Sequence, residues 1–200
     1  MTWLRSRWFT WICAALCGWF VLTQLPSRAF RREATEWVTG DERQQELARS
    51  VNSQLPGVAP RQFTTGSELF DGEWAFGTGV MAAIGNAQLA LQSSDARDAS
   101  KSASDRALRH VTSWEIRGFD RARWGSDPLT PADSREAHVA YLGYLNLALS
   151  IRHAVGSSDY DELGEQITER LVTLYRGSPG MLLETYPGEY YPVDNAMAIA

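Results

Sequence analysis

An uninterrupted apolar run near the N-terminus is the feature that most constrains this chain. Residues 8–25 (WFTWICAALCGWFVLTQL) carry no charged side chain. At about 1.5 Å per residue, an α-helix of this length comes close to spanning the hydrocarbon core of a bilayer. We therefore expect the chain to enter or cross a membrane, with the membrane as a partner through residues 8–25.

The run is either a cleaved signal or an uncleaved anchor. Two arginines precede it, and Ser27 and Ala29 offer small residues for cleavage after Ala29. The length of the run, its tryptophans and the arginines on both flanks favour an anchor. We predict a membrane-anchored or exported protein, with residues 1–32 as anchor or signal segment and the extracytoplasmic side favoured for the domain of residues 33–200.

Charged residues and cysteines are distributed unevenly. Five of the 19 basic residues precede the first acid, Glu33, so the remainder has 14 basic side chains against 24 acidic ones. Such a domain repels phosphate backbones, which excludes nucleic acid as a partner class. Because Cys13 and Cys17 both lie in the apolar run, the acidic domain has neither a disulfide framework nor thiolate ligands. We expect no metal and no cofactor.

Beyond the apolar run, apolar residues recur at helical spacing, and no segment alternates as a half-buried strand does. Glycines and a Pro-Gly pair separate the periodic segments. The pattern predicts an all-α domain with helices over residues 41–54, 67–91, 98–116, 130–153 and 158–177, and another from about residue 193. The helix over 67–91 is rich in small residues, so it can pack closely as an inner helix. Thr130, Pro131 and Asp133 form the clearest start signal, because they match an N-cap, a first helical residue and a capping-box acid.

Successive helix pairs with short turns predict helical hairpins that form part of an (α/α)6 toroid or barrel, in which each pair buries its face against its neighbours. The apolar ending AMAIA has no cap and no polar tail. We therefore expect residues 33–200 to be a partial barrel domain, truncated at its C-terminus.

Three pieces between Trp114 and Ala200 resemble the linalool dehydratase/isomerase family of bacterial exported lyases. They are WEIRGFDRARWGSDPL before a helix, the helix text HVAYLGYLNLAL, and the loop ETYPGEYYPVDN leading into AMAIA. The resemblance implies the N-terminal half of an (α/α)6 barrel with a deep central cavity that binds a tertiary or allylic alcohol. By position, it implies that Trp124, Asp127, Tyr144 and residues 186–195 face the cavity.

The chain departs from that family at the acid–base positions. The family uses cysteine thiols beside the substrate, and here Thr185 and Asp194 occupy roughly those places. A cavity histidine of the family corresponds to Tyr144. The resemblance therefore implies a shared cavity with a different acid–base set.

The loop ETYPGEYYPVDN interleaves three carboxylates with tyrosines. Two carboxylates held near each other in an aromatic setting have their pKa values pushed apart, which leaves one as acid and one as base. Such a pair would protonate a leaving hydroxyl or move a proton during isomerisation, and it would equally suit glycosidic cleavage. We assign the catalytic positions to Glu189, Asp194 and Tyr144. The predicted substrate-binding residues are Trp124, Asp127, Glu184, Tyr186, Tyr190, Tyr191, Asn195, Glu73 and Trp74.

Plainer interpretations stand beside these assignments. Asp194 would cap the last helix, and Trp124 to Asp127 would form a turn. Glu73 would be a helix-start acid next to a buried Trp74. We expect the three histidines to lie on helix flanks rather than in a catalytic site. They are His110, His138 and His153.

These features lead to one main hypothesis and two alternatives. The main hypothesis is an exported or membrane-anchored (α/α)-barrel enzyme of lyase or isomerase type that applies carboxylate acid–base chemistry to a small hydroxylated substrate. The alternatives are a carbohydrate-active (α/α)6 enzyme and a non-catalytic helical binding module at the membrane surface. A homo-oligomer is left open.

Overall fold

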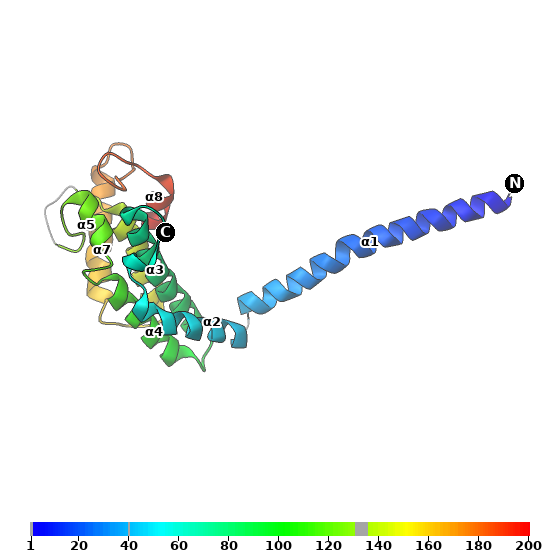
Figure 1. Cartoon of the computed structure of the whole chain (residues 1–200), viewed down its shortest axis with the longest axis horizontal. Helices are drawn as coiled ribbons and strands as arrows, with labels where there is room; N and C mark the ends of the chain where they lie inside the picture. The colour runs from blue at the N-terminus through cyan, green and yellow to red at the C-terminus, as the bar shows by residue number, and fades with distance from the viewer. Residues whose placement is uncertain (1, 40, 131–135) are drawn as a thin grey trace. The chain divides into compact units, whose positions relative to one another are not determined.

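The computed structural model describes residues 2–39, 41–130 and 136–200. Over these residues the chain has eight α-helices and no strand, which confirms the predicted all-α class (Figure 1). The α-helices are α1 (Thr2–Thr39), α2 (Asp41–Gln54), α3 (Glu68–Gln92), α4 (Arg97–Val111), α5 (Gly118–Trp124), α6 (Val139–Ala154), α7 (Asp161–Gly177) and α8 (Pro192–Ile199). Two short 3-10 helices, Leu55–Gly57 and Pro60–Gln62, follow α2.

The chain divides into two units, Met1–Gln44 and Gln45–Ala200. The first unit consists mainly of α1, in which the window Trp8–Arg28 is long and apolar enough to cross a membrane and has 0% of its residues buried. Its tryptophans Trp8, Trp11 and Trp19 are each 69–70% exposed. An exposed apolar helix of this length is consistent with a signal sequence or an anchor.

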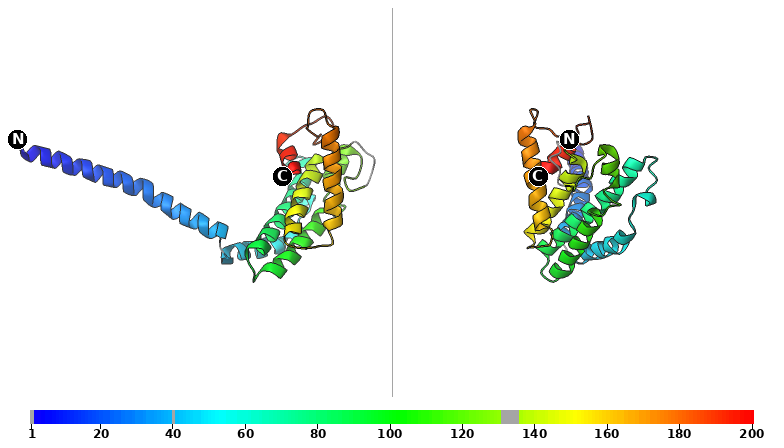
Figure 2. Two further views of the ribbon diagram at one scale, coloured as in Figure 1. Left: turned by 180° about the vertical axis from the view of Figure 1, so that it is seen from behind. Right: turned by 90° about the vertical axis from the view of Figure 1, so that its left-hand side faces the viewer.

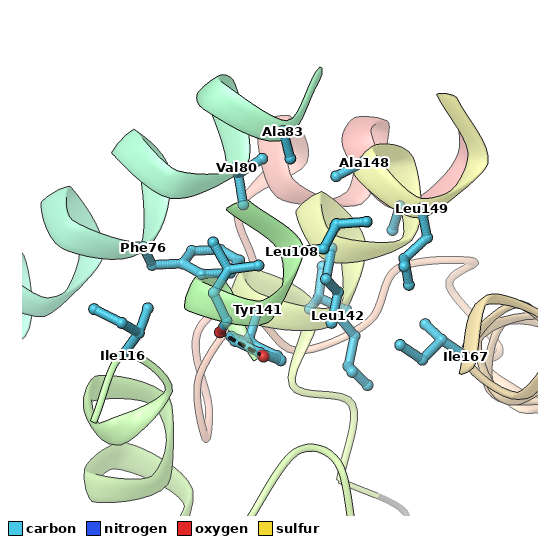
Figure 3. Packing of buried hydrophobic residues seen from close by; sticks show 14 of the residues in the cluster. Phe76, Val80, Ala83, Leu108, Ile116, Tyr141, Leu142, Ala148, Leu149 and Ile167 are labelled. Carbon is cyan, nitrogen blue, oxygen red and sulfur yellow. Dashed lines mark hydrogen bonds between the residues drawn. The ribbon is translucent and has the colours of Figure 1, made fainter. Parts of the chain in front are cut away.

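The second unit has its core between α3, α4 and α6. α3 packs most extensively against α4 and also against α6, while α6 contacts α7 and α8 (Figure 2). Phe76 and Val80 of α3, Leu108 of α4 and Tyr141 of α6 meet in this core (Figure 3). The fully buried Tyr141 hydroxyl donates to the carbonyl of Val111 at 3.0 Å, so the aromatic side chain also ties α6 to the end of α4.

Glycines allow the close packing expected of the helix over residues 67–91. A Cβ added at Gly79 would lie 2.4 Å from Cγ1 of Val111 in α4, and one at Gly72 would lie 2.4 Å from Cβ of Phe119 in α5. Because atoms cannot approach so closely, these two positions require the absence of a side chain. α3 therefore packs closely against α4 and α5, as its composition predicts.

Two of the expected helix boundaries are wrong. The helix expected over 98–116 ends at Val111, and Trp114 beyond it is 64% exposed with the guanidinium of Arg121 3.2 Å from its ring centroid. The buried face of α4 therefore ends at Val111, and the chain then turns into a separate helix, α5. The apolar periodicity did not predict α5.

The second wrong boundary is the start of α6, which begins at Val139 rather than at Thr130. Pro131 and Asp133 of the expected capping signal lie outside the described residues. Immediately before α6, His138 has a left-handed backbone (φ 49°) and a buried side chain. Arg170 of α7 donates to the carbonyls of Pro128 and Glu136 at 2.8 and 2.9 Å. The contact to Glu136 engages a backbone carbonyl that would accept a hydrogen bond within the helix if the helix began at Thr130.

Candidate functional site

Acidic and tyrosine side chains from several elements meet at one end of the second unit. We call this group the acid–tyrosine cluster and define it by these residues: Glu73 of α3, Arg123 of α5, Tyr144 of α6, Tyr186 and Glu189 of the loop before α8, and Asp194 of α8. Five of its six members were predicted from the sequence as site residues, and Arg123 was not. The loop and helix signals therefore converge in space.

The loop before α8 holds its shape through a dense set of hydrogen bonds. The buried Asn195 side chain accepts from Leu183 N at 2.8 Å and donates to Leu183 O at 3.0 Å. Thr185, also buried, donates its amide to Glu189 O at 2.8 Å and accepts from Tyr191 N through its hydroxyl at 3.1 Å. Gly188 takes the left-handed backbone (φ 79°) that the turn between these residues needs. Asn195 and Thr185 thus position the loop rather than point out of it.

Glu73 is the carboxyl group with the most perturbed environment in the acid–tyrosine cluster. The Tyr186 hydroxyl donates to its Oε1. Partial burial raises the pKa of Glu73 above its usual 4.5, and the charges of Asp194 and Glu189 raise it further, while the Tyr186 bond and Arg123 oppose the shift. Three carboxyl groups therefore share one electrostatic environment, and Glu73 is the one driven toward its protonated form.

Asp194 lies beside Tyr144 on the facing helices α8 and α6. The Tyr144 hydroxyl donates to Oδ1 of Asp194 at 3.3 Å. Burial raises the pKa of Tyr144, and the Asp194 charge adds to the effect, so the phenol stays protonated as a donor. Asp194 is half-buried in the first turn of α8, and its side chain is directed at the cluster as well as being placed where a capping acid would be.

Glu189 has both carboxylate oxygens engaged. Oε1 pairs with the guanidinium of Arg123, and Oε2 accepts from the Tyr191 hydroxyl at 2.8 Å. Arg123 also lies 5.0 Å from the centroid of the Tyr186 ring. The guanidinium thereby connects Glu189 with Tyr186 and brings a positive charge to the edge of the cluster.

The other predicted site residues are placed differently. Asp127 accepts from Leu129 N at 3.0 Å and pairs with Arg117 at 2.9 Å, so it serves the turn after α5. Glu184 accepts from the exposed Tyr190 at 3.1 Å. Trp74 is 61% exposed and is not the buried tryptophan of the plainer interpretation.

A second polar constellation, which sequence reasoning missed, lies behind Trp124. The imidazole of His138 is 1% exposed and its Nδ1 lies 2.5 Å from Oδ2 of the fully buried Asp120. Its Nε2 lies 3.2 Å from Oγ of Ser126, and the indole of Trp124 packs against its ring with centroids 4.7 Å apart. His138 is therefore not a helix-flank residue. The spacing of these residues along the sequence does not predict the group, because they meet only when α5 packs beside the start of α6.

The structure also contains an open pocket of about 630 Å³ beside the cluster. It is formed mainly by the 3-10 segment Pro60–Gln62 and the facing sides of α3 and α5, and the side chains at its wall include Phe63, Phe119, Glu115 and Arg123. None of the sequence-predicted site residues lines this pocket, but Arg123 joins its wall to the acid–tyrosine cluster. Across the part of the chain that the structure describes, no group of three or more His, Cys, Asp or Glu side chains is placed to hold a metal ion.

No protein-family model, curated protein or solved structure matches this chain. Its function therefore has to follow from the side chains and their geometry.

Proposed function

We propose that the acid–tyrosine cluster is the acid–base centre of a lyase or isomerase that acts on a small hydroxylated molecule. The observation that supports this proposal is the convergence of Glu73 and Asp194 from α3 and α8, with the pKa of Glu73 raised by burial and by the neighbouring acids. A carboxyl group with a raised pKa beside a second carboxyl group is an arrangement suited to acid–base catalysis.

The contacts divide the roles among the carboxyl groups. Glu73 is the acid, because its environment favours the protonated form and its proton can pass to a leaving hydroxyl. Asp194 is the base, held in place by Tyr144, and takes a proton from the carbon adjacent to the one that bears the departing oxygen, so that a carbon–carbon double bond forms as water leaves. Glu189 fits neither step well because Arg123 and Tyr191 occupy its oxygens, so we assign it to the binding and orientation of Arg123.

The substrate class follows from the surroundings of the two carboxyl groups. A cluster that already contains three carboxyl groups disfavours an anionic substrate, whereas the phenols of Tyr144 and Tyr186 offer hydrogen bonds and ring faces to a neutral alcohol. The resemblance to linalool dehydratase/isomerase points to the same class, a tertiary or allylic alcohol. We further propose that the hairpins α3–α4 and α6–α7 are part of an (α/α)6 barrel, and that α1 anchors the enzyme to a membrane.

The proposal is tested with the full chain in detergent or in membranes. A panel of small tertiary and allylic alcohols is incubated with the protein, and the alkene and isomer products are measured by gas chromatography with mass spectrometry. Glu73→Gln and Asp194→Asn should each lower turnover by roughly 10²- to 10⁴-fold, because each removes a proton-transfer group.

A matched control keeps the result specific. Glu162→Gln alters an exposed acid on α7 that is not part of the cluster, and it should leave turnover unchanged. Wild-type turnover in both Glu73→Gln and Asp194→Asn, with the helical spectrum preserved, would contradict the acid–base roles. It would favour the alternative of a non-catalytic binding module.

A further inference from the structure

Ser126, His138 and Asp120 lie in the order expected of a nucleophile, a base and an orienting acid. Asp120 lies in α5, Ser126 follows Gly125, whose left-handed backbone (φ 78°) ends that helix, and His138 immediately precedes α6. The distances are 2.5 Å from Asp120 Oδ2 to His138 Nδ1 and 3.2 Å from His138 Nε2 to Ser126 Oγ. This order of contacts is the one by which serine hydrolases on unrelated folds are recognised.

Burial fixes the orientation of the imidazole. Asp120 is 0% exposed and His138 is 1% exposed, and the ring packs against Trp124. Because the Asp120 carboxylate holds the proton on Nδ1, Nε2 is left facing the hydroxyl of Ser126. Burial raises the pKa of Asp120, while the hydrogen bond and charge of His138 oppose that rise.

Ser126 and Glu136 form the accessible side of this constellation. Ser126 is only partly buried, and the side chain of Glu136 is 36% exposed. The Ser126 hydroxyl donates to Oε2 of Glu136, which itself lies 3.5 Å from His138 Nε2. The Ser126 hydroxyl therefore has two potential proton acceptors within reach, Glu136 Oε2 and His138 Nε2.

We propose that Ser126 is the nucleophile of a second catalytic site, which hydrolyses small neutral esters. Ser126 Oγ forms a bond to the ester carbonyl carbon while its proton passes to His138 Nε2, and Asp120 stabilises the resulting imidazolium. The carbon–oxygen bond to the alcohol breaks, and the alcohol leaves with the proton from His138. Water then attacks the acyl group and gives a proton to His138, which returns it to Ser126 as the carboxylic acid departs.

The surroundings argue for a neutral ester in particular. The carboxyl groups of Asp120, Glu136 and Asp127 outnumber the two guanidinium groups near this constellation, Arg117 and Arg170, which disfavours an anionic acyl group. Trp124 supplies an apolar wall beside His138. No residue of this second site belongs to the acid–tyrosine cluster, so neither proposal depends on the other.

The test is covalent labelling of the full chain with a fluorophosphonate, followed by peptide mass spectrometry. The expected result is one phosphonyl adduct, located on Ser126, together with hydrolysis of p-nitrophenyl acetate. Ser126→Ala should abolish both, while Ser157→Ala, which alters an exposed serine elsewhere, should change neither. Asp120→Asn should lower the labelling rate at least 10²-fold with an unchanged melting curve, because it leaves His138 poorly oriented.

The outcomes separate the two sites. Glu73→Gln and Asp194→Asn should leave Ser126 labelling at the wild-type rate. Absence of an adduct on Ser126, or ester hydrolysis that persists in Ser126→Ala, would contradict the proposed second site. Asp120, Ser126 and His138 would then serve only to hold α5 against the start of α6. Neither result would change the alcohol assay, which tests the acid–tyrosine cluster separately.

Discussion

Arg152 is a fully buried cation whose partners are supplied by other parts of the fold. Its guanidinium makes two bonds to the carboxylate of Asp105, at 2.7 and 3.0 Å, and one to the carbonyl of Gly156 at 2.7 Å. Asp105→Ala would leave this charge buried with a single acceptor, which typically costs about 3–5 kcal/mol. We expect chemical denaturation to show a loss of that size. The exposed Asp159→Ala serves as the control, and an equal loss in both variants would contradict the assignment.

Glu73 should also affect stability in a pH-dependent way. Burial and the neighbouring acids raise its pKa above 4.5 in the folded protein, so folding favours its protonated form. The stability that this group contributes is fully present below its unfolded pKa and is lost as pH rises through the raised folded value. The melting temperature of Glu73→Gln relative to wild type should therefore increase with pH over this interval and then level off. A difference that stays constant between about pH 4 and about pH 8 would show that the carboxyl does not titrate in this way.

Individual residues of the acid–tyrosine cluster could be predicted from the sequence only in part. Glu73, Tyr144 and Asp194 could be named because acids and aromatics alternate near expected helix ends, and the structure brings them together. The proposed division of roles could not be predicted, because it depends on the pairing of Arg123 with Glu189 across 66 positions. The pairing of Asp120 with His138 likewise depends on the fold.

At the scale of elements, the contact between α3 and α4 is set by single glycines. A methyl group at Gly79 would meet Val111 at 2.4 Å, so Gly79→Ala should lower stability by about 1–3 kcal/mol through overpacking. Gly85 lies on the same helix with nothing within 4 Å of an added Cβ. Gly85→Ala should raise stability by about 1 kcal/mol, because alanine favours the helix more than glycine does. Thermal melts of the two variants should shift in opposite directions, and a shift of the same sign would refute this packing.

Apolar periodicity predicted the longer helices of the second unit, whereas it missed the short α5 and two helix boundaries. The helices predicted over 41–54, 67–91 and 158–177 agree with α2, α3 and α7 to within three residues, since each carries its own apolar face and stop residues. α6 begins late because the segment before it is committed to contacts with α5 and α7 through His138 and Arg170. Local capping preferences of about 1 kcal/mol do not outweigh such tertiary contacts.

At the scale of the whole molecule, α1 is the feature that can hold the chain at a membrane. The apolar window Trp8–Arg28 has no buried residue, which is unfavourable in water unless a membrane takes up its side chains.

We expect the full chain, expressed in a bacterial host, to resist carbonate extraction and to keep its N-terminus. Leu16→Arg combined with Trp19→Arg should release it, because each arginine near the helix centre costs about 2.5–3.5 kcal/mol on insertion. Leu47→Arg places the same charge on an exposed position of α2 and should leave the protein in the membrane. Intact-mass measurement decides between anchor and signal, because a mature N-terminus at Phe30 would show that the segment is removed.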